Sequence, residues 1–395
     1  MHMHLPAFRS QAAGLRRLSA ALLLAGAAGV GGCATTPATS DAFDRLATRP
    51  ATVRADAPVA VPFDPVVLVE RGERVAGDPA LEVVEAGFAY RFVDEASRAR
   101  FLDESPRHRV AMGGACARMG PLSGAGDPSR VEAWNGRLFL FASDECRRAF
   151  LAAPAAFVEP APEVRSAQDP GRPGGELLRG KAARWLGTED LAPGSAVGVE
   201  LARDEESGGR TWRVVERRVS STGLRHLAWT GWDDEAWWTE ASFGGAAASG
   251  LAGRAAGTAR ALDQEQLAAF AREALREPVF AGLVLARGEA ACSTLGAATW
   301  DVSDDSLAAG AAPETLRGEI LEIVWRGARV EWLVEPLTGR PLAARGIFRQ
   351  ADGRMGEELV AFGEWTETEG VRVPLARARR GAPTTRFDAM RLERP

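Results

Sequence analysis

The residues best suited to chemistry are five soft donors in one short part of the chain. They are His108, Met112, Cys116, Met119 and Cys146, and the first four share the segment HRVAMGGACARM. Thiolate and thioether ligands select Cu(I) over harder ions. The Cys-x-x-Cys and His-x-x-x-His spacings of a structural zinc site do not occur in the sequence. The set predicts a soft-metal site, with copper or zinc as the candidate ion.

The same two cysteines allow two other interpretations. A Cys116–Cys146 disulfide would form readily in an exported protein and would tie the loop around Cys116 to the segment around Cys146. Alternatively, both are buried free thiols that fill space, as a methionine in such a loop often does. The residues alone leave the metal site, the disulfide and simple packing open.

A catalytic constellation is not found in the sequence. A nucleophilic cysteine needs a base within hydrogen-bond reach, and after residue 32 the only histidines are His108 and His226. His226 alternates with apolar neighbours on a predicted strand, and we interpret it as a surface residue rather than a base. Gly-x-Ser-x-Gly, phosphate-loop and His-Glu-x-x-His motifs are also absent from the sequence. We therefore expect a protein that is not an enzyme.

The N-terminus has the pattern of an export leader. Residues 1–32 contain three arginines, no acid, and an apolar run shorter than the roughly 20 residues that cross a bilayer. The junction VGGCA resembles the lipobox of bacterial lipoproteins, which implies cleavage before Cys33 and lipid attachment to it. Ala34 after that cysteine resembles lipoproteins sorted to the outer membrane. The resemblance implies a membrane-anchored protein that faces the periplasm.

Charge and composition divide the rest of the chain. The formal charge is −5, and loss of the leader's arginines would make it more negative, so nucleic acid is excluded as a partner. Thr, Ala and Pro in residues 33–61 predict a flexible tether. Pro, Gly and charge in residues 159–176 predict a linker. The linker separates two predicted folded regions, residues 62–158 and residues 177–395.

Residues 62–158 contain an internal repeat. Residues 77–102 and 126–151 align without a gap at an offset of 49 and share eight positions, among them the pairs Phe92 and Phe141, and Phe101 and Phe150. Each copy predicts a strand, a turn at glycine, a second strand ending at phenylalanine, and a short helix whose aromatic residue packs on the hairpin. Ser97 occupies the position of Cys146 in the first copy, which favours the packing interpretation of Cys146.

These motifs resemble the YHS domain in its exported form. FDPV at residues 63–66 stands where the family has Tyr-Asp-Pro-Val, and GGACA at residues 113–117 where it has Gly-Gly-Tyr-Cys-Ala. Shorter YHS modules accompany heavy-metal transporters and some oxygenases, so the resemblance implies metal handling by residues 62–158. The chain departs from the pattern at Val67, where short modules have cysteine, and at Arg91 and Leu140, where the family has histidine.

Residues 177–395 predict an antiparallel meander. Alternating segments at 210–219, 223–229, 235–240, 319–325, 328–334, 341–348, 357–365, 370–377 and 384–392 are separated by turns. One helix interrupts them, with Asp263 as N-cap, Gln266 three residues later, and Leu267, Phe270 and Leu275 on one face. The pattern resembles the half-barrel of LolA-like periplasmic lipoprotein carriers. This resemblance implies a concave face that binds acyl chains or hydrophobic partners without catalysis.

The combined prediction is an α+β protein with a two-repeat YHS-type domain followed by a curved sheet domain with a crossing helix. We expect a non-catalytic cell-envelope lipoprotein that binds a soft metal through the first domain and a hydrophobic ligand or an envelope protein through the second. The alternative is a structural or protein-docking lipoprotein with the Cys116–Cys146 disulfide and no metal. Cys292 is interpreted as a buried small residue without a partner.

Overall fold

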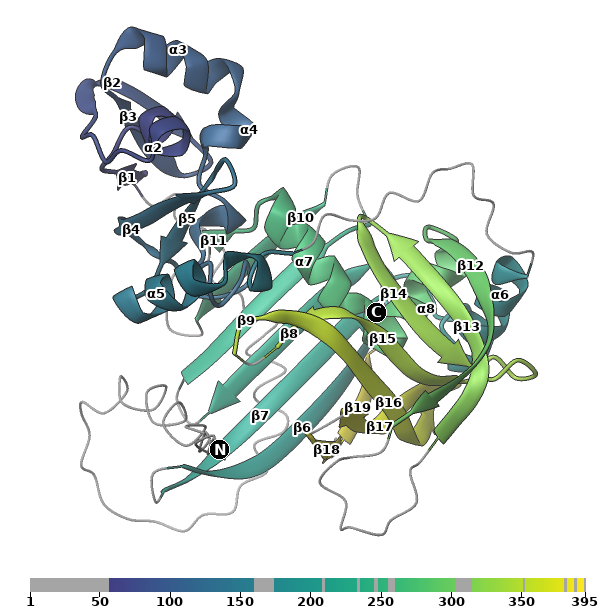
Figure 1. Ribbon diagram of the computed structural model, residues 1–395. Coiled ribbons are helices and arrows are strands. Elements are labelled where there is room, and N and C mark those ends of the chain that lie inside the picture. Colours follow the sequence, from purple (N-terminus) through teal and green to yellow (C-terminus); the bar gives the residue numbers. More distant parts are fainter. Residues whose placement is uncertain are drawn as a thin grey trace, which may run out of the picture.

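The computed structural model describes residues 57–159, 174–207, 210–232, 235–244, 248–254, 260–302, 315–350, 352–379, 382–386 and 389–393. The leader, Cys33, and most of the predicted tether and linker lie outside these ranges. Figure 1 shows a small N-terminal module beside a larger domain of long curved strands and helices. Helices and antiparallel sheets occur together, in agreement with the predicted α+β class. No helix in the described ranges has the length and apolar character needed to cross a membrane.

The N-terminal module consists of two similar units, as the repeat predicts. The first unit is β2 (Asp78–Glu85), β3 (Phe88–Phe92) and α3 (Glu95–Asp103), and the second is β4 (Asp127–Trp134), β5 (Arg137–Phe141) and α5 (Asp144–Ala152). The remaining elements are β1 (Val59–Val61), α2 (Pro65–Arg71), α4 (Ser105–His108), η2 (Met112–Gly114) and η3 (Pro154–Ala156). Because β1 pairs in parallel with β3, the last residues of the predicted tether belong to the module.

Aromatic residues hold the helix of each unit on its hairpin in the same way. The rings of Phe92 and Phe101 lie 5.2 Å apart at an interplanar angle of 59°, and the rings of Phe141 and Phe150 have the same distance and angle. All four side chains are buried. Aromatic pairs prefer such tilted contacts to a face-to-face arrangement. The sequence repeat is therefore a repeat of packing as well as of secondary structure.

The C-terminal domain, here called the sheet domain, contains two antiparallel sheets. The first has the order β11-β10-β9-β8-β7-β6-β19 and the second the order β12-β13-β14-β15-β16-β17-β18. The strands of the first are β6 (Ala196–Ser207), β7 (Arg210–Ser221), β8 (Arg225–Trp232), β9 (Glu235–Ser242), β10 (Ser249–Arg254), β11 (Arg260–Ala261) and β19 (Ala389–Glu393). Those of the second are β12 (Ala291–Asp301), β13 (Thr315–Trp325), β14 (Ala328–Val334), β15 (Pro341–Arg349), β16 (Met355–Thr368), β17 (Val371–Arg379) and β18 (Ala382–Arg386).

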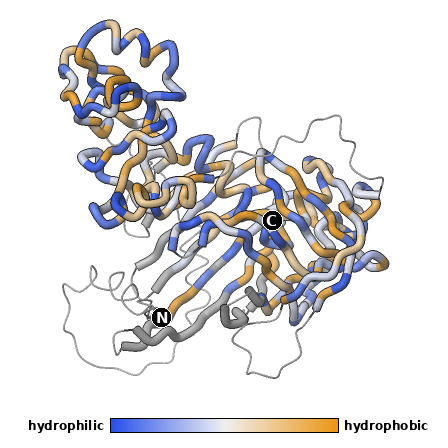
Figure 2. Tube along the Cα trace, in the orientation of Figure 1, coloured by the Kyte–Doolittle hydropathy of each residue, from blue (hydrophilic) through white to orange (hydrophobic). Residues whose placement is uncertain are grey.

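The meander prediction is right for eight segments and wrong for the ninth. Residues 384–392 contain parts of two strands, because β18 pairs with β17 whereas β19 pairs with β6 of the other sheet. The pattern also misses β6, β10, β11 and β12. Figure 2 shows polar and apolar residues alternating along the strands of the second sheet, as expected where one face packs on a core.

Helices pack between the two sheets and fill the main core. They are α6 (Gly175–Leu186), α7 (Gln264–Leu275) and α8 (Pro278–Arg287). The helix α8 contacts β7 of the first sheet and β17 of the second, while α7 contacts β14. The predicted capping box of α7 is confirmed, since Asp263 accepts a bond from the N–H of Gln266 and the Gln266 side chain accepts one from the N–H of Asp263.

The prediction of a single helix is wrong, because α6 and α8 are also present. The helix α8 has the sequence PVFAGLVLAR, and its residues from Pro278 to Leu285 are all buried. A helix buried all round has no polar face and therefore no 3.6-residue period to reveal it. The core of the sheet domain combines side chains of these helices with both sheets, including the fully buried Phe280 and Trp332.

Candidate functional site

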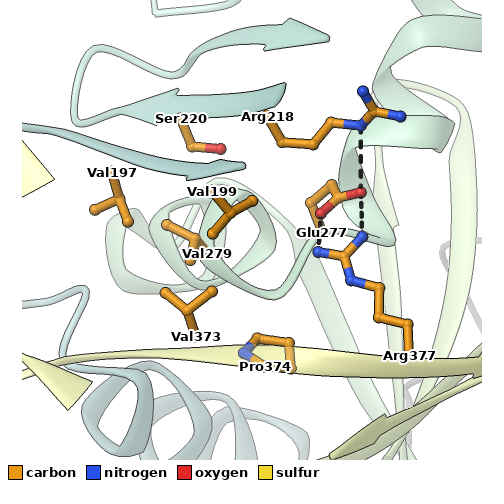
Figure 3. Close-up of a pocket in the computed structure, with 9 residues that line it drawn as sticks. All are labelled: Val197, Val199, Arg218, Ser220, Glu277, Val279, Val373, Pro374 and Arg377. Carbon is orange, nitrogen blue, oxygen red and sulfur yellow. Dashed lines mark hydrogen bonds and ion pairs between the residues drawn. The ribbon is translucent and has the colours of Figure 1, made fainter. Parts of the chain in front are cut away.

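A small pocket lies at the junction of the two sheets, under α8. Figure 3 shows its apolar wall, formed by Val197 and Val199 of β6, Val279 of α8, and Val373 and Pro374 of β17. The pocket encloses about 10 Å³, which is roughly the space of one water molecule. A larger ligand would enter only if α8 moved away from the strands.

Three charged residues close one end of this pocket. Glu277 is the N-cap of α8, Arg377 lies on β17 and Arg218 on β7. Arg377 donates to both carboxylate oxygens of Glu277, with Nη1 to Oε1 at 2.6 Å, and Nε of Arg218 lies 3.8 Å from the same Oε1. We call these residues the Glu277 cluster. The cluster connects α8 to a strand of each sheet.

The Glu277 cluster is charged although it is largely buried. The side chains of Glu277 and Arg377 are 13% and 12% exposed. Burial alone would raise the pKa of Glu277, but the charges of Arg377 and Arg218 and the bonds from Arg377 outweigh burial and hold this pKa at about 2. Removing two charges from water is costly and is repaid only by good geometry. The presence of such a pair is therefore weak evidence for stability.

His226 lies beside this cluster and is buried, so its interpretation as a surface residue is wrong. Its Nδ1 is 2.9 Å from Oγ of Ser220, and its ring lies 5.6 Å from the ring of Phe270 and 5.1 Å from that of Phe280. Burial lowers the pKa of His226 to about 4, with Arg218 acting in the same direction and Glu277 against it. The alternation of β8 is as predicted, but the face that carries His226 packs under α7 and α8.

A serine next to a neutral imidazole is the core of a nucleophile–base pair. Ser220 and His226 are, however, only 3% and 2% exposed. Among the described residues no carboxylate is hydrogen-bonded to the His226 ring to orient it. The pair therefore connects β7 to β8 beneath the helices, and we do not assign it a catalytic role.

The two cysteines singled out in the sequence meet as free thiols in the N-terminal module. Cys116 is buried, and its backbone forms an isolated parallel β-bridge with Leu140 of β5. Cys146 is the third residue of α5 and is partly exposed. Their side chains lie close enough for each thiol to shift the pKa of the other, and Nη1 of Arg118 lies 3.9 Å from Sγ of Cys146. The neighbouring Cys116 thiol lowers the pKa of Cys146 to about 5 against the effect of burial, with help from Ser143 and Arg118. The Cys146 thiol, together with burial, raises the pKa of Cys116.

The other predicted donors have different environments. His108 is fully buried and its Nε2 lies 3.4 Å from Oε1 of Glu70. Met112 packs in the same apolar cluster as Cys146, and Met119 is 42% exposed. Within the described ranges no three His, Cys, Asp or Glu side chains are placed to hold a metal ion. The structure thus brings the two thiols together without a histidine.

The position of Cys146 carries an interaction in both repeats. In the first repeat, Oγ of Ser97 donates to Oδ2 of the buried Asp64 at 2.6 Å. In the second repeat, the Cys146 thiol lies beside the Cys116 thiol, and each shifts the pKa of the other. The helix of each repeat therefore places a hydroxyl or a thiol beside one buried side chain, Asp64 in the first repeat and Cys116 in the second. This correspondence argues against the interpretation of Cys146 as a residue that only fills space.

The loop around Cys116 also attaches the module to the sheet domain. Oε2 of Glu265, in the first turn of α7, accepts bonds from the N–H of Met112 at 2.9 Å and from Arg137 at 2.6 Å. Nε2 of Gln266 donates to the carbonyl of Pro121 at 2.7 Å. A Cβ at Gly113 would lie 2.3 Å from Oε1 of Gln266. The same Gln266 side chain thus caps α7 and holds the loop.

Arginines of the sheet domain add a second set of contacts to the module. Arg349 of β15 donates to the carbonyl of Phe157 at 3.1 Å, and Arg272 of α7 lies 2.6 Å from the carboxylate of Glu159. The module is therefore held against both α7 and the end of β15. Nothing in the local sequence of either partner indicates this interface.

Sequence reasoning missed the Glu277 cluster and misplaced Cys292. A usable signal was Glu277 directly before the apolar run that forms α8, because an acid at that point suits the positive end of a helix. Arg377 carries no comparable local signal. Cys292 lies in β12 and is partly exposed rather than buried, with Sγ 3.7 Å from the carbonyl of Ala290.

Comparisons with known proteins give distant structural likenesses. No family model matches the sequence, and no curated protein matches it. A crystal structure described as an outer membrane lipoprotein-sorting protein domain, from Vibrio parahaemolyticus, has a TM-score of 0.33 at 10% identity and covers 55% of this chain and 92% of its own. A LolA superfamily protein from Nitrosomonas europaea has a TM-score of 0.31 at 14% identity, over 56% and 94%.

A third solved structure is a DUF1329 family protein from Desulfovibrio piger. Its TM-score is 0.34 at 13% identity, and the match covers 55% of this chain and 92% of that one. At such low identities and TM-scores these likenesses carry no argument about function. The functional proposal rests on the geometry of the pocket and the Glu277 cluster.

Proposed function

We propose that this chain is a non-catalytic cell-envelope lipoprotein whose sheet domain binds an acyl chain with an anionic head group. The observation that carries the proposal is the buried Glu277 cluster beside an apolar pocket, between α8 and both sheets (Figure 3). The pocket supplies the apolar wall and the cluster supplies two guanidinium groups. This combination matches a ligand that is apolar along its length and anionic at one end.

The apolar part of the ligand would take space that α8 now covers. Val279 on the underside of α8 faces Val197 and Val199 of β6 and Val373 of β17. If α8 moved outward, these side chains would line a groove continuous with the core. Each buried methylene contributes about 0.8 kcal/mol, so an acyl chain would replace the contacts that α8 gives up.

The head group would take the place of the Glu277 carboxylate. Arg377 already presents both Nη atoms to a carboxylate, and planar guanidinium groups suit carboxylate and phosphate equally. An incoming anion would keep Arg377 and Arg218 paired while Glu277 left with α8. Opening would therefore not leave an unpaired buried cation, which is the costly event in such clusters.

The N-terminal residues support a position at a membrane surface. The lipobox-like VGGCA and the tether-like composition of residues 33–61 favour a protein held by a lipid on Cys33, facing the periplasm from the outer membrane. Radiolabelled palmitate supplied to cells should label the wild-type protein and not Cys33→Ser. We do not extend the soft-metal hypothesis, because the two thiols come together without a histidine in the described residues.

The proposal is tested by comparing palmitate with its uncharged methyl ester. Displacement of a fluorescent fatty acid from the purified protein should show palmitate binding at least about tenfold more tightly than the ester, since bonds to charged groups contribute roughly 1.5–3 kcal/mol. Arg377→Ala should remove most of this preference. Arg345→Ala is the matched control, because Arg345 of β15 pairs with Glu331 of β14 in the same sheet as Arg377, and neither residue lines the pocket.

Two results would contradict the proposal. If palmitate did not displace the fluorescent probe from the wild-type protein, a structural or protein-docking lipoprotein would be favoured. An unchanged preference in a folded Arg377→Ala variant would remove the role of the Glu277 cluster. Circular dichroism of each variant establishes that it is folded.

A further inference from the structure

The contact between Cys116 and Cys146 is independent of the pocket in the sheet domain. The two residues are 30 positions apart in sequence, yet the fold brings them together as free thiols, close enough for each to shift the pKa of the other. Cys116 is fixed by backbone bonds, with its N–H donating to the carbonyl of Gly124 at 3.0 Å and its carbonyl accepting from Met119 at 2.9 Å. A rigid loop and a helix therefore hold the two sulfurs together.

The environments of the two thiols differ in ways that assign them different roles. Cys146 is partly exposed, lies in the first turn of the nine-residue helix α5, and has Arg118 beside its sulfur. The N-terminus of a helix and a neighbouring guanidinium both stabilise a thiolate. Cys116 is 1% exposed. A substrate could reach Cys146, whereas Cys116 can react only with a group already attached to Cys146.

We propose that Cys146 and Cys116 form a thiol–disulfide exchange site that accepts a disulfide as substrate. The Cys146 thiolate attacks one substrate sulfur, forms a mixed disulfide, and releases the other substrate sulfur as a thiolate that takes a proton from water. Cys116 then loses its proton to water and attacks the Cys146 sulfur. The Cys116–Cys146 disulfide forms, and the second substrate sulfur leaves as a thiol.

The electrons balance over these two steps. The protein dithiol loses two electrons and the substrate disulfide gains them, so no further oxidant is needed. Return to the dithiol requires an external dithiol reductant, and the proposal is limited to the single exchange. An exported protein would meet disulfides, which persist outside the reducing cytosol.

The test uses the full-length chain with Cys33 and Cys292 replaced by serine, so that only the thiol pair remains. Oxidised glutathione and the disulfide-bonded protein insulin are offered separately, and products are followed by intact mass. With both cysteines present, the protein should end as an internal disulfide without attached glutathione. Cys116→Ser should stop at a mixed disulfide on Cys146, and Cys146→Ser should react far more slowly.

Arginine variants separate a reactive site from a merely accessible thiol. Cys146 should react about tenfold faster than a thiol of the urea-unfolded protein, because thiolate content and nucleophilicity partly offset each other. Arg118→Ala should reduce this advantage, whereas Arg148→Ala, an exposed position on the same helix, should not. A faster reaction with insulin than with glutathione would identify protein disulfides as the substrate. Equal rates for folded and unfolded protein, or a persistent mixed disulfide with both cysteines present, would overturn the proposal.

Discussion

Arg377 and Glu277 are 100 residues apart in sequence and form a two-bond ion pair inside the sheet domain. Arg377 belongs to β17 and Glu277 is the N-cap of α8, so the pair joins a strand of the second sheet to the helix that covers the pocket. Residues close together in the sequence could not connect this strand to this helix. The pair therefore ties the N-terminus of α8 to β17, in addition to the apolar contacts of the helix.

Removal of one partner should destabilise the domain strongly. Arg377→Ala leaves the Glu277 carboxylate buried without its main partner, and we expect a loss of about 3–5 kcal/mol in the free energy of unfolding. Urea denaturation followed by tryptophan fluorescence measures this loss. The double variant Glu277→Leu, Arg377→Leu should lose less than Arg377→Ala, because Arg218, the remaining charge of the cluster, keeps Glu216 as a partner. If the double variant were the less stable of the two, the cost would come from packing rather than charge.

Glu277 should make stability sensitive to acid. Its pKa is about 2 in the folded protein and 4.5 in the unfolded reference, so the unfolded state binds the proton first as pH falls. The stabilisation is complete above pH 4.5 and is lost progressively as pH falls towards 2. Glu277→Gln should show a weaker decline over this window in urea midpoints measured at successive pH values. Parallel declines in the two proteins would assign the acid sensitivity to other carboxylates.

His226 should act in a separate pH window. Its pKa is about 4 when folded and 6.5 in the unfolded reference, so between these values the unfolded chain is protonated while the folded protein is not. Stability should be greatest above pH 6.5 and should fall as pH decreases from 6.5 towards 4. His226→Gln should remove this part of the pH dependence. An unaltered profile would mean that the buried ring accepts a proton without cost.

The contact between Gly113 and Gln266 should be intolerant of a methyl group. Gly113 has φ of +57°, and a Cβ there would lie 2.3 Å from the Gln266 side chain. Gly87 is the matched control, because its φ is +82° and nothing lies within 4 Å of a Cβ. Gly87→Ala should cost about 1 kcal/mol for the left-handed backbone alone. Gly113→Ala should cost more, by roughly 1–2 kcal/mol, because Gln266 must give up hydrogen bonds.

Two measurements distinguish these glycine variants. Urea denaturation gives the free energies, and limited proteolysis of the segment between module and sheet domain reports on their attachment. Faster cleavage is expected for Gly113→Ala and not for Gly87→Ala. Equal effects of the two substitutions would show that Gln266 moves aside freely and that the interface does not depend on it.

The sequence by itself determined the features that depend on near neighbours. The repeat of hairpin and helix, the capping box between Asp263 and Gln266, and most of the antiparallel strands follow from residue spacing and turns. Each of these patterns is completed within a few tens of residues. Their physical basis is local, because backbone geometry fixes which side chains share a face.

Only the tertiary structure decided which faces are buried and which distant groups meet. Alternation on β8 is the same whether His226 points to solvent or to the core, and the packing of α7 and α8 settled that choice. The Glu277 cluster, the thiol pair and the module interface each join segments far apart in sequence. Their partners are selected by burial and charge, since a polar group removed from water must find a partner wherever the fold supplies one.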